Sequence, residues 1–506
     1  MALDPNILGT ITFLLPIITL FVGFLILKWD ALKVSIAGWI VEIIVLLVAY
    51  PEAEIMRSSI WADVSLWNAF AVIWTGFIFG QMYRNTGLLE RLVKVLDSLF
   101  KHKWGKALTL SGVVGGLIGA FNGYATYPVT IQGIKELGYK GWRAATGYLV
   151  FLSSSIPFVS LWIAGTVAET SSHVPIDEIV PFVGLLTIPL VVVSTFGFAH
   201  ILKIDLKAEH NLALLILALL GAITGRIIFT QIIPSLYLLT LIGSSLFMFL
   251  YLFLYSRLKK MEKESLTDIG IGGIFRPFAP IAIGIFVIIL WKLEPIASVI
   301  VKAELTINLW GFNPINLNLL NNPGFYILLI ALSSYIFKIR NPKTKSLQSN
   351  PIKDLIQGSK RSYKTMLTLF FGSGLVGMLL NAGQIDAVRN MIIHLSATVY
   401  SVILSLFSFA SAMVFAEGLP ADFLLSSMQI GVDVRLPLAF LVAIIVTLTM
   451  GVADPVKPSL LKYTSTLADA PDTDEPNMFR TALIWQLTEV AVVIIEVLIA
   501  VPFLIQ

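Results

Sequence analysis

The sequence contains no cysteine, which excludes disulfide bonds and cysteine-based metal sites. Charged residues are also scarce: they make up 13% of the 506 residues, against about 25% in a typical soluble domain. Apolar residues make up 57%, and the mean hydropathy is +0.86. A soluble chain of this length would divide into domains with charged surfaces. We therefore expect lipid to be the solvent for most of this protein's surface.

Several catalytic and nucleotide-binding motifs are missing as well. The chain has no phosphate-binding loop, no H-E-x-x-H pair and no plausible G-x-S-x-G elbow. Its five histidines fall at predicted helix ends or in loops. We therefore predict no enzyme activity, no cofactor, no metal and no ATP-driven pumping. The net charge of +4 is spread over short loops, which does not favour a nucleic-acid partner.

Long apolar runs are the dominant feature that is present. A run of about 20 apolar residues spans a bilayer, and the sequence holds about ten to twelve such runs. Residues 1–5 lack the positive region of a secretory signal, so the first run is expected to be retained. The fold class we predict is an all-α polytopic membrane protein of the cell membrane, for which a homo-oligomer stays open. The expected spans cover residues 7–27, 34–50, 66–86, 143–167, 179–202, 211–225, 228–255, 277–292, 323–339, 365–381, 436–455 and 479–505.

The distribution of lysine and arginine predicts how these runs are oriented. Basic residues mark cytoplasmic loops, and they flank residues 107–133 on both sides. That stretch is therefore expected to enter and leave the membrane on the cytoplasmic side, as a re-entrant hairpin. Residues 396–430 would form the matching hairpin from outside, although residues 395–415 are long enough to cross fully.

Two halves of opposite orientation would make an inverted-topology repeat. We divide the chain into an N-terminal half (1–256) that contains repeat 1 at about 66–202, linker spans with a cytoplasmic loop (257–364), and a C-terminal half (365–506) that contains repeat 2. In residues 298–320 polar residues are interleaved with apolar ones, and this segment is expected to lie on the outer surface.

Each half also contains polar, proline-bearing interruptions where a helix should lie at membrane depth. Non-helical backbone in a bilayer is tolerated only where protein or a water-filled cavity satisfies it, and paired interruptions are typical of transporter binding sites. The free N–H groups of a broken helix suit an anion. A proline kink with serines bonded back to their own helix is the structural alternative. The residues predicted to contact substrate are Asn122, Gly123, Tyr124, Thr126, Tyr127, Ser153, Ser154, Ser155, Gly418, Lys457 and Ser459.

Carboxylates at the second-half interruptions are candidates for proton coupling. Glu417, Asp422 and Asp454 all lie there, and a charge at the centre of a membrane helix costs about 2.5–3.5 kcal/mol. The alternatives are that Asp454 pairs with Lys457 and that Asp422 caps a helix. Glu42, alone in an apolar run, is expected to snorkel or to find a partner on a peripheral helix.

The chain resembles the lactate permease family of bacterial and archaeal proton-coupled monocarboxylate transporters. The resemblance is carried by Trp67, Asn-Thr-Gly at 85–87, Pro-Val-Thr-Ile at 128–131, Leu-Gly-Tyr at 137–139, the serines and proline at 153–157, and Met-Phe-Arg at 478–480. The segments at 121–128, 416–422 and 452–459 depart from the family's acidic, hydroxyl-rich and lysine-bearing motifs.

The resemblance implies proton symport of a monocarboxylate such as lactate or glycolate. The expected partners are a small organic anion, a coupling proton or sodium ion, and the lipid bilayer. A sodium-coupled carboxylate carrier or a cation/proton antiporter of related architecture stays open as the alternative.

Overall fold

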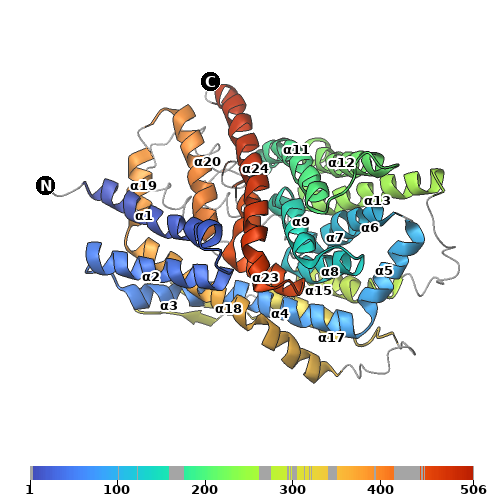
Figure 1. The fold of residues 1–506 in the computed structure, drawn as a ribbon, viewed down its shortest axis with the longest axis horizontal. Coiled ribbons are helices and arrows are strands. Elements are labelled where there is room, and N and C mark those ends of the chain that lie inside the picture. Colours follow the sequence, from blue (N-terminus) through green and yellow to red (C-terminus); the bar gives the residue numbers. More distant parts are fainter. Residues whose placement is uncertain are drawn as a thin grey trace.

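A computed structural model of the chain describes residues 4–100, 102–121, 123–158, 176–260, 275–292, 296, 298, 305–312, 314–317, 319–320, 322–339, 350–392, 395–414, 445, 448–449 and 451–504. These residues form helices almost throughout (Figure 1).

The helices of the first half of the chain are α1 (Pro5–Phe21), α2 (Ala31–Ala49), α3 (Ile55–Ser65), α4 (Trp67–Asn85), α5 (Leu88–Leu99), α6 (Lys103–Leu108), α7 (Gly115–Phe121), α8 (Gly123–Glu136), α9 (Gly141–Ser153), α11 (Ile176–Ile201), α12 (Asn211–Ile227) and α13 (Thr240–Leu258). Further along lie α15 (Ala279–Lys292), β1 (Leu305–Ile307), β2 (Ile315–Leu317), α17 (Pro323–Ser333), α18 (Pro351–Asn381), α19 (Gln384–Ile392), α20 (Ala397–Val414), α23 (Pro458–Leu467) and α24 (Glu475–Leu504).

Capping residues fix where several of these helices begin. Asp4 precedes α1 and accepts a hydrogen bond from the Asn6 N–H at 2.8 Å, while Asp30 accepts one from the Lys33 N–H at 3.1 Å before α2. Asn350 caps α18 in the same manner. Asp and Asn are favoured at this position because their oxygens satisfy N–H groups that the helix leaves free.

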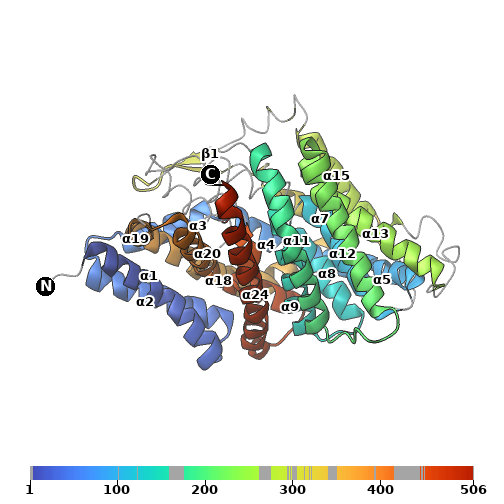
Figure 2. The same ribbon diagram turned by 90° about the horizontal axis from the view of Figure 1, so that it is seen from above.

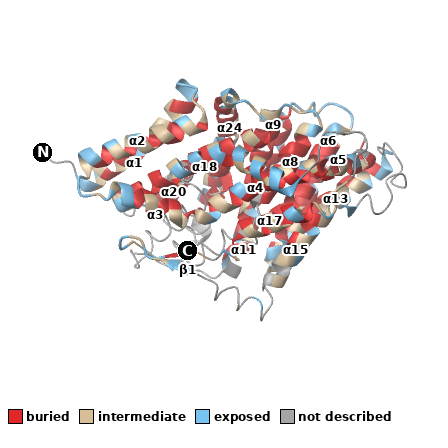
Figure 3. Cartoon of the chain, turned by 90° about the horizontal axis from the view of Figure 1, so that it is seen from below, coloured by how far each residue is buried: buried red, intermediate tan, exposed pale blue. Residues whose placement is uncertain are grey.

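Helix α24 stands at the centre of the molecule. Figures 1 and 2 place it between a group that holds α1, α2, α18, α19 and α20 and a group that holds α5 to α9 and α11 to α13. It contacts α9 and α11 on one side and α20 on the other. Buried residues concentrate around it, where α4, α8, α9 and α18 gather (Figure 3).

Seven helices in the described part of the chain are long and apolar enough to cross a membrane. The count becomes eight if α3 and α4, which meet at a bend of 54°, form one span. Large apolar side chains such as Ile26, Val48 and Leu258 are exposed on these helices, as expected of a surface that faces lipid. The protein is therefore a multi-pass membrane protein. Much of two predicted spans, at 143–167 and 436–455, lies outside the described residues.

The segment from α6 to α8 is a helical hairpin. Lys103 Nζ, near its start, donates to the Gly138 carbonyl oxygen, beyond its end, at 2.9 Å. Leu110 lies against Gly133, and Gly115 lies against Thr130. The two arms are thus antiparallel and start and finish at the same end; the first arm ends with α7 at Phe121 and the second starts with α8 at Gly123. The glycines at these positions leave room for the close approach. Of the second predicted hairpin, 396–430, residues 415–430 lie outside the described residues.

Two segments predicted to be loops are helical. Residues 88–99 form α5, which buries Leu88, Leu92 and Leu96 while Lys94 pairs with Glu90 at 2.9 Å. Residues 351–364 are the first turns of α18. The basic residues of α5 suggested a solvent-exposed loop. Its leucines, however, recur at helical spacing and form one apolar face, and this periodicity predicts a helix despite the charges.

Residues 305–317 contain the one pair of strands that the structure describes. β1 and β2 run antiparallel with Thr306 opposite Asn316. Phe312, between the strands, stacks on Trp61 of α3 with ring centroids 5.6 Å apart. This polar-interleaved segment was predicted to lie on the surface; the ribbon is a small exception to an all-α fold.

Candidate functional site

The first helix interruption follows α9. The helix ends at Ser153, and residues 156–158 form a single tight turn that contains Pro157. Ser153 Oγ donates to Glu489 Oε1 of α24 at 2.9 Å and to the Val150 carbonyl oxygen at 2.6 Å. Ser153 therefore bonds back to its own helix, as in the structural alternative, and it also bonds to another helix.

The next two serines face helices on another side. Ser154 Oγ lies 2.8 Å from Ser194 Oγ of α11. Ser155 Oγ accepts a hydrogen bond from Arg226 of α12 at 3.1 Å, and the Ser154 carbonyl oxygen accepts one at 3.2 Å. The segment 153–155 is thus held between an acidic side chain and a basic one.

The second interruption lies between Ala453 and α23. Asp454, Pro455 and Val456 form a tight turn, and Pro458 starts the next helix. Lys457 Nζ pairs with Asp454 Oδ1 at 2.5 Å, and both side chains are almost completely buried. This pairing is the structural alternative to a free, proton-carrying Asp454. Ser459 is buried in the first turn of α23.

The two interruptions touch each other. A Cβ placed on Gly451, just before the second interruption, would lie 2.6 Å from the Ser153 carbonyl oxygen and 3.3 Å from Pro157 Cδ. Only glycine fits here, because real Cβ atoms do not approach backbone oxygen so closely. Segments that are about 300 positions apart in sequence thus meet at one point of close backbone contact.

This contact predicts the effect of a single methyl group. Gly451→Ala should lower the free energy of unfolding by about 1–3 kcal/mol, as expected for overpacking. Gly372→Ala on α18 is the matched control, since a Cβ there meets nothing within 4 Å; alanine in a helix should leave stability unchanged or raise it by up to about 1 kcal/mol. Unfolding of both variants in detergent measures the difference, and equal stability would argue against the contact.

The hairpin brings tyrosines to the same region. Tyr148 of α9 donates to Thr126 Oγ1 of α8 at 2.7 Å. The ring of Tyr127 packs edge-on against Tyr148 and against Tyr463 of α23, with centroids 5.8 and 5.7 Å apart. Thr126 and Tyr127, two predicted substrate contacts, therefore join the hairpin to both interrupted helices. Gly123 and Tyr124 start α8, while Asn122, Glu417, Gly418 and Asp422 lie outside the described residues.

Sequence reasoning missed Glu489. It is fully buried on α24, next to Ser153. With the amide nitrogen of Gln486 turned toward acceptors, Gln486 donates to Glu489 Oε2 at 3.1 Å. No described lysine or arginine forms an ion pair with Glu489. A lone carboxylate in the run Leu-Thr-Glu-Val-Ala-Val-Val was the pattern that could have identified it, as it did for Glu42.

Sequence reasoning also missed Arg226, which lies in the last turn of α12 and is almost completely buried. Its guanidinium is 5.1 Å from the Phe158 ring centroid and donates to the Ala222 carbonyl oxygen at 3.3 Å. Both residues that the sequence did not single out therefore contact the first interruption.

Glu42 behaves as the sequence suggested. It is buried on α2 and accepts a hydrogen bond from Gln384 Nε2 of α19 at 2.8 Å. A partner on a peripheral helix thus accounts for this carboxylate.

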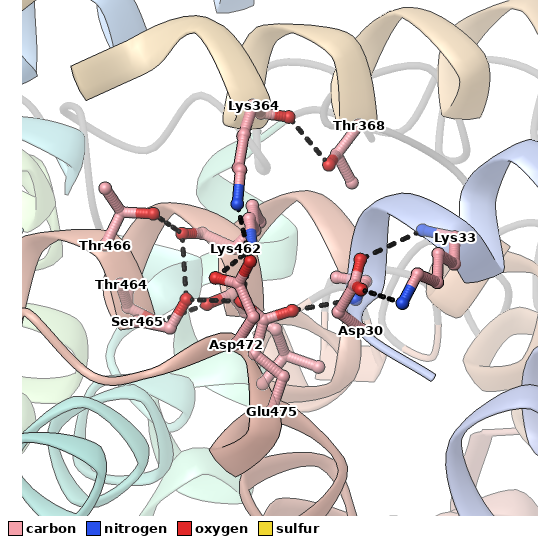
Figure 4. Close-up of polar contacts among 12 residues, drawn as sticks. Asp30, Lys33, Lys364, Thr368, Lys462, Thr464, Ser465, Thr466, Asp472 and Glu475 are labelled. Carbon is pink, nitrogen blue, oxygen red and sulfur yellow. Dashed lines mark hydrogen bonds and ion pairs between the residues drawn. The ribbon is translucent and has the colours of Figure 1, made fainter. Parts of the chain in front are cut away.

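An ion cluster with a buried and a part-exposed half ties α23 and α24 to neighbouring helices (Figure 4). Lys462 Nζ lies 2.8 Å from Glu475 Oε1 and 2.8 Å from Asp472 Oδ1. Glu475 Oε2 accepts from the Ala31 N–H at 2.7 Å, which anchors the first residue of α2. Lys364 of α18 adds a bond to Asp472 Oδ2 at 2.6 Å. We call Lys462, Asp472, Glu475 and Lys364 the Lys462 cluster; its charges are mutually satisfied, so it holds the fold together.

The described residues contain no group of three or more His, Cys, Asp or Glu side chains placed to hold a metal ion. Comparison with models of known protein families and with curated protein sequences found no match for the chain.

Proposed function

We propose that the protein is a secondary active transporter that carries a small organic anion, a monocarboxylate such as lactate or glycolate, across the cell membrane. Transport would proceed by alternating access in symport with protons, without covalent chemistry. The observation that carries the proposal is the contact between the two helix interruptions, at Gly451 and Ser153. Interrupted helices that meet inside a bundle are typical of transporter binding sites.

The surroundings of this contact support the proposal. A helical hairpin places Thr126 beside Tyr148 at the same point, and Glu489 offers a buried carboxyl group that can gain and lose a proton. In the proposed inverted repeat, residues 66–202 and 365–506 are the two units that move against each other. Glu417, Asp422 and Asp454 stay proposed coupling groups with Glu489.

The resemblance to the lactate permease family supports the same substrate class. The shared segments at 128–131 and 153–157 belong to the hairpin and the first interruption. We therefore propose membership of that family as a divergent member.

A sodium-coupled carrier or a cation/proton antiporter is the second candidate. It is favoured by the Ser153 hydroxyl beside Glu489, since oxygen ligands also suit a hard cation. In that case the carboxylate would bind the cation directly.

Uptake by proteoliposomes tests the proposal. Purified protein should accumulate labelled lactate or glycolate when the lumen is made alkaline, with or without sodium. Accumulation that requires a sodium gradient and ignores the proton gradient would establish the second candidate. Absence of any gradient-driven movement of a carboxylate or a cation would overturn both.

A further inference from the structure

A small cavity adjoins the first interruption. It has a volume of about 20 Å³ and lies among α7, α9, α11, α12, α13 and the turn that precedes α7. A volume of this size accommodates about one water molecule. Its walls carry apolar side chains, six hydroxyl-bearing side chains and Arg226. The cavity is therefore partly open, of mixed polarity and positively charged.

Arg226 has donors left over in this cavity. Its terminal nitrogens donate to the carbonyl oxygens of Ala222 and Ser154 and to Ser155 Oγ, at 3.3, 3.2 and 3.1 Å. Its Nε is buried and bonds to no described residue. All of its described partners are neutral, and no described carboxylate pairs with it. A buried guanidinium normally has an anionic partner, because an uncompensated charge is costly in a low-dielectric interior.

A second polar group in the cavity also lacks a partner. Ser111 Oγ, on the first arm of the hairpin, is buried and bonds to no described residue. Ser245 Oγ, by contrast, is satisfied by the carbonyl oxygens of Gly112 and Leu241 at 3.0 and 2.8 Å. Buried polar groups are seldom left unsatisfied unless water or a ligand completes them.

We propose that this cavity receives one oxygen of the carboxylate group of the transported anion, with Arg226 as the residue that selects for the negative charge. The inference rests on the proposed function and names the binding residue and substrate class for it. The Arg226 guanidinium supplies one positive charge and a free N–H, and Ser111 supplies a hydroxyl donor. Arginine suits this task because its guanidinium stays charged when buried and its N–H groups bond strongly to a carboxylate oxygen.

The shape of the site selects among anions. One positive charge balances one carboxylate, so a monocarboxylate leaves no charge unpaired, whereas a dicarboxylate would bury a second negative charge without a partner. The small volume admits one carboxylate oxygen and excludes the substituent, and Met248, whose side chain is adaptable, forms part of the apolar wall. Lys457, the cation expected from the sequence to balance the anion, is already paired with Asp454.

Binding to the purified full-length protein in detergent tests the subsite. Isothermal titration would use choline salts of lactate, acetate and succinate, and choline chloride. We expect lactate and acetate to bind more tightly than succinate or chloride. Arg226→Gln should raise the Kd for lactate by at least about 100-fold, and Ser111→Ala should raise it by about 10-fold, as expected for charge-assisted and single hydrogen bonds.

Two further variants serve as controls for Arg226→Gln. Arg226→Lys keeps the charge and can still donate to the Ser154 carbonyl oxygen, so it decides the outcome if Arg226→Gln does not fold; its Kd should rise by about 10-fold. Arg57→Gln removes a guanidinium that is more than half exposed and pairs with Glu54 at 3.0 Å, and should bind lactate as the unchanged protein does.

Each remaining outcome is decisive. If the unchanged protein transports lactate while Arg226 variants bind it normally, the subsite is overturned and the proposed function stands. Binding of chloride or succinate as tight as that of lactate would overturn the monocarboxylate class. If the unchanged protein neither binds nor transports any carboxylate, both proposals fail together.

Discussion

Replacing Glu489 by glutamine should abolish uptake driven by a proton gradient while anion exchange between two loaded compartments continues. Glu489 is fully buried, and its described partners, Ser153 and Gln486, are neutral. An ionised carboxylate at such a position costs several kcal/mol, whereas the protonated acid is neutral and can donate a hydrogen bond. Glutamine keeps the shape and can still accept the hydrogen bond from Ser153, but its NH2 group cannot accept the bond from Gln486 and it cannot release a proton. Accumulation in proteoliposomes should therefore fall to the level of protein-free vesicles.

Glu42→Gln is the matched control for this result. Glu42 is a buried carboxyl group with an amide partner, as Glu489 is, but it lies on α2 and bonds to Gln384 of α19. Proton-driven uptake should persist in this variant. If accumulation survives in Glu489→Gln and disappears in Asp454→Asn, coupling belongs to Asp454, as the sequence alone suggested.

Replacing Lys462 by methionine should lower the free energy of unfolding by about 3–5 kcal/mol. Lys462 is completely buried and is the only described cation that contacts Glu475, itself completely buried. Its loss leaves that carboxylate without a countercharge and loosens the tie to the first residue of α2. Denaturant unfolding in mixed micelles, followed by circular dichroism, measures the loss.

Two variants test whether burial of the charges causes the predicted loss of stability in Lys462→Met. Lys94→Met removes an exposed partner of Glu90 on α5, and helix-surface pairs of this kind contribute about 0.3–0.5 kcal/mol. The double variant Lys462→Met with Glu475→Leu removes both buried charges and should recover much of the lost stability. A double variant that is no more stable than the single one would contradict the role of the unpaired charge.

Local sequence patterns predicted two kinds of feature: the helix ends that accompany proline, and the orientation of a segment whose ends carry basic residues. Proline and serine at 153–157 and proline at 455 and 458 coincide with helix ends, so both interruptions were visible in the sequence. Basic residues on both sides of 107–133 likewise pointed to a segment that returns to its starting end.

The sequence did not reveal the features that depend on which helix surfaces pack against each other. Glu489 and Arg226 each look like an isolated charge in an apolar helix, and only the crossing of α9 with α24 and α12 gives them partners. The pairing of Asp454 with Lys457 was visible in their spacing, but their burial was not, since it depends on the helices packed around the turn. The helical state of α5 could be read from its leucine spacing and was obscured by its basic residues, Arg91 and Lys94.

The three serines at the end of α9 have one more consequence. Ser153 is hydrogen-bonded to an acid, Glu489 of α24, and Ser154 and Ser155 accept hydrogen bonds from a base, Arg226 of α12. Because this segment is only three residues long, a displacement of one end also displaces the other end. We therefore expect a change in charge at the acid to affect the base through these three residues, in which case thermodynamic reciprocity requires the same influence in the opposite direction.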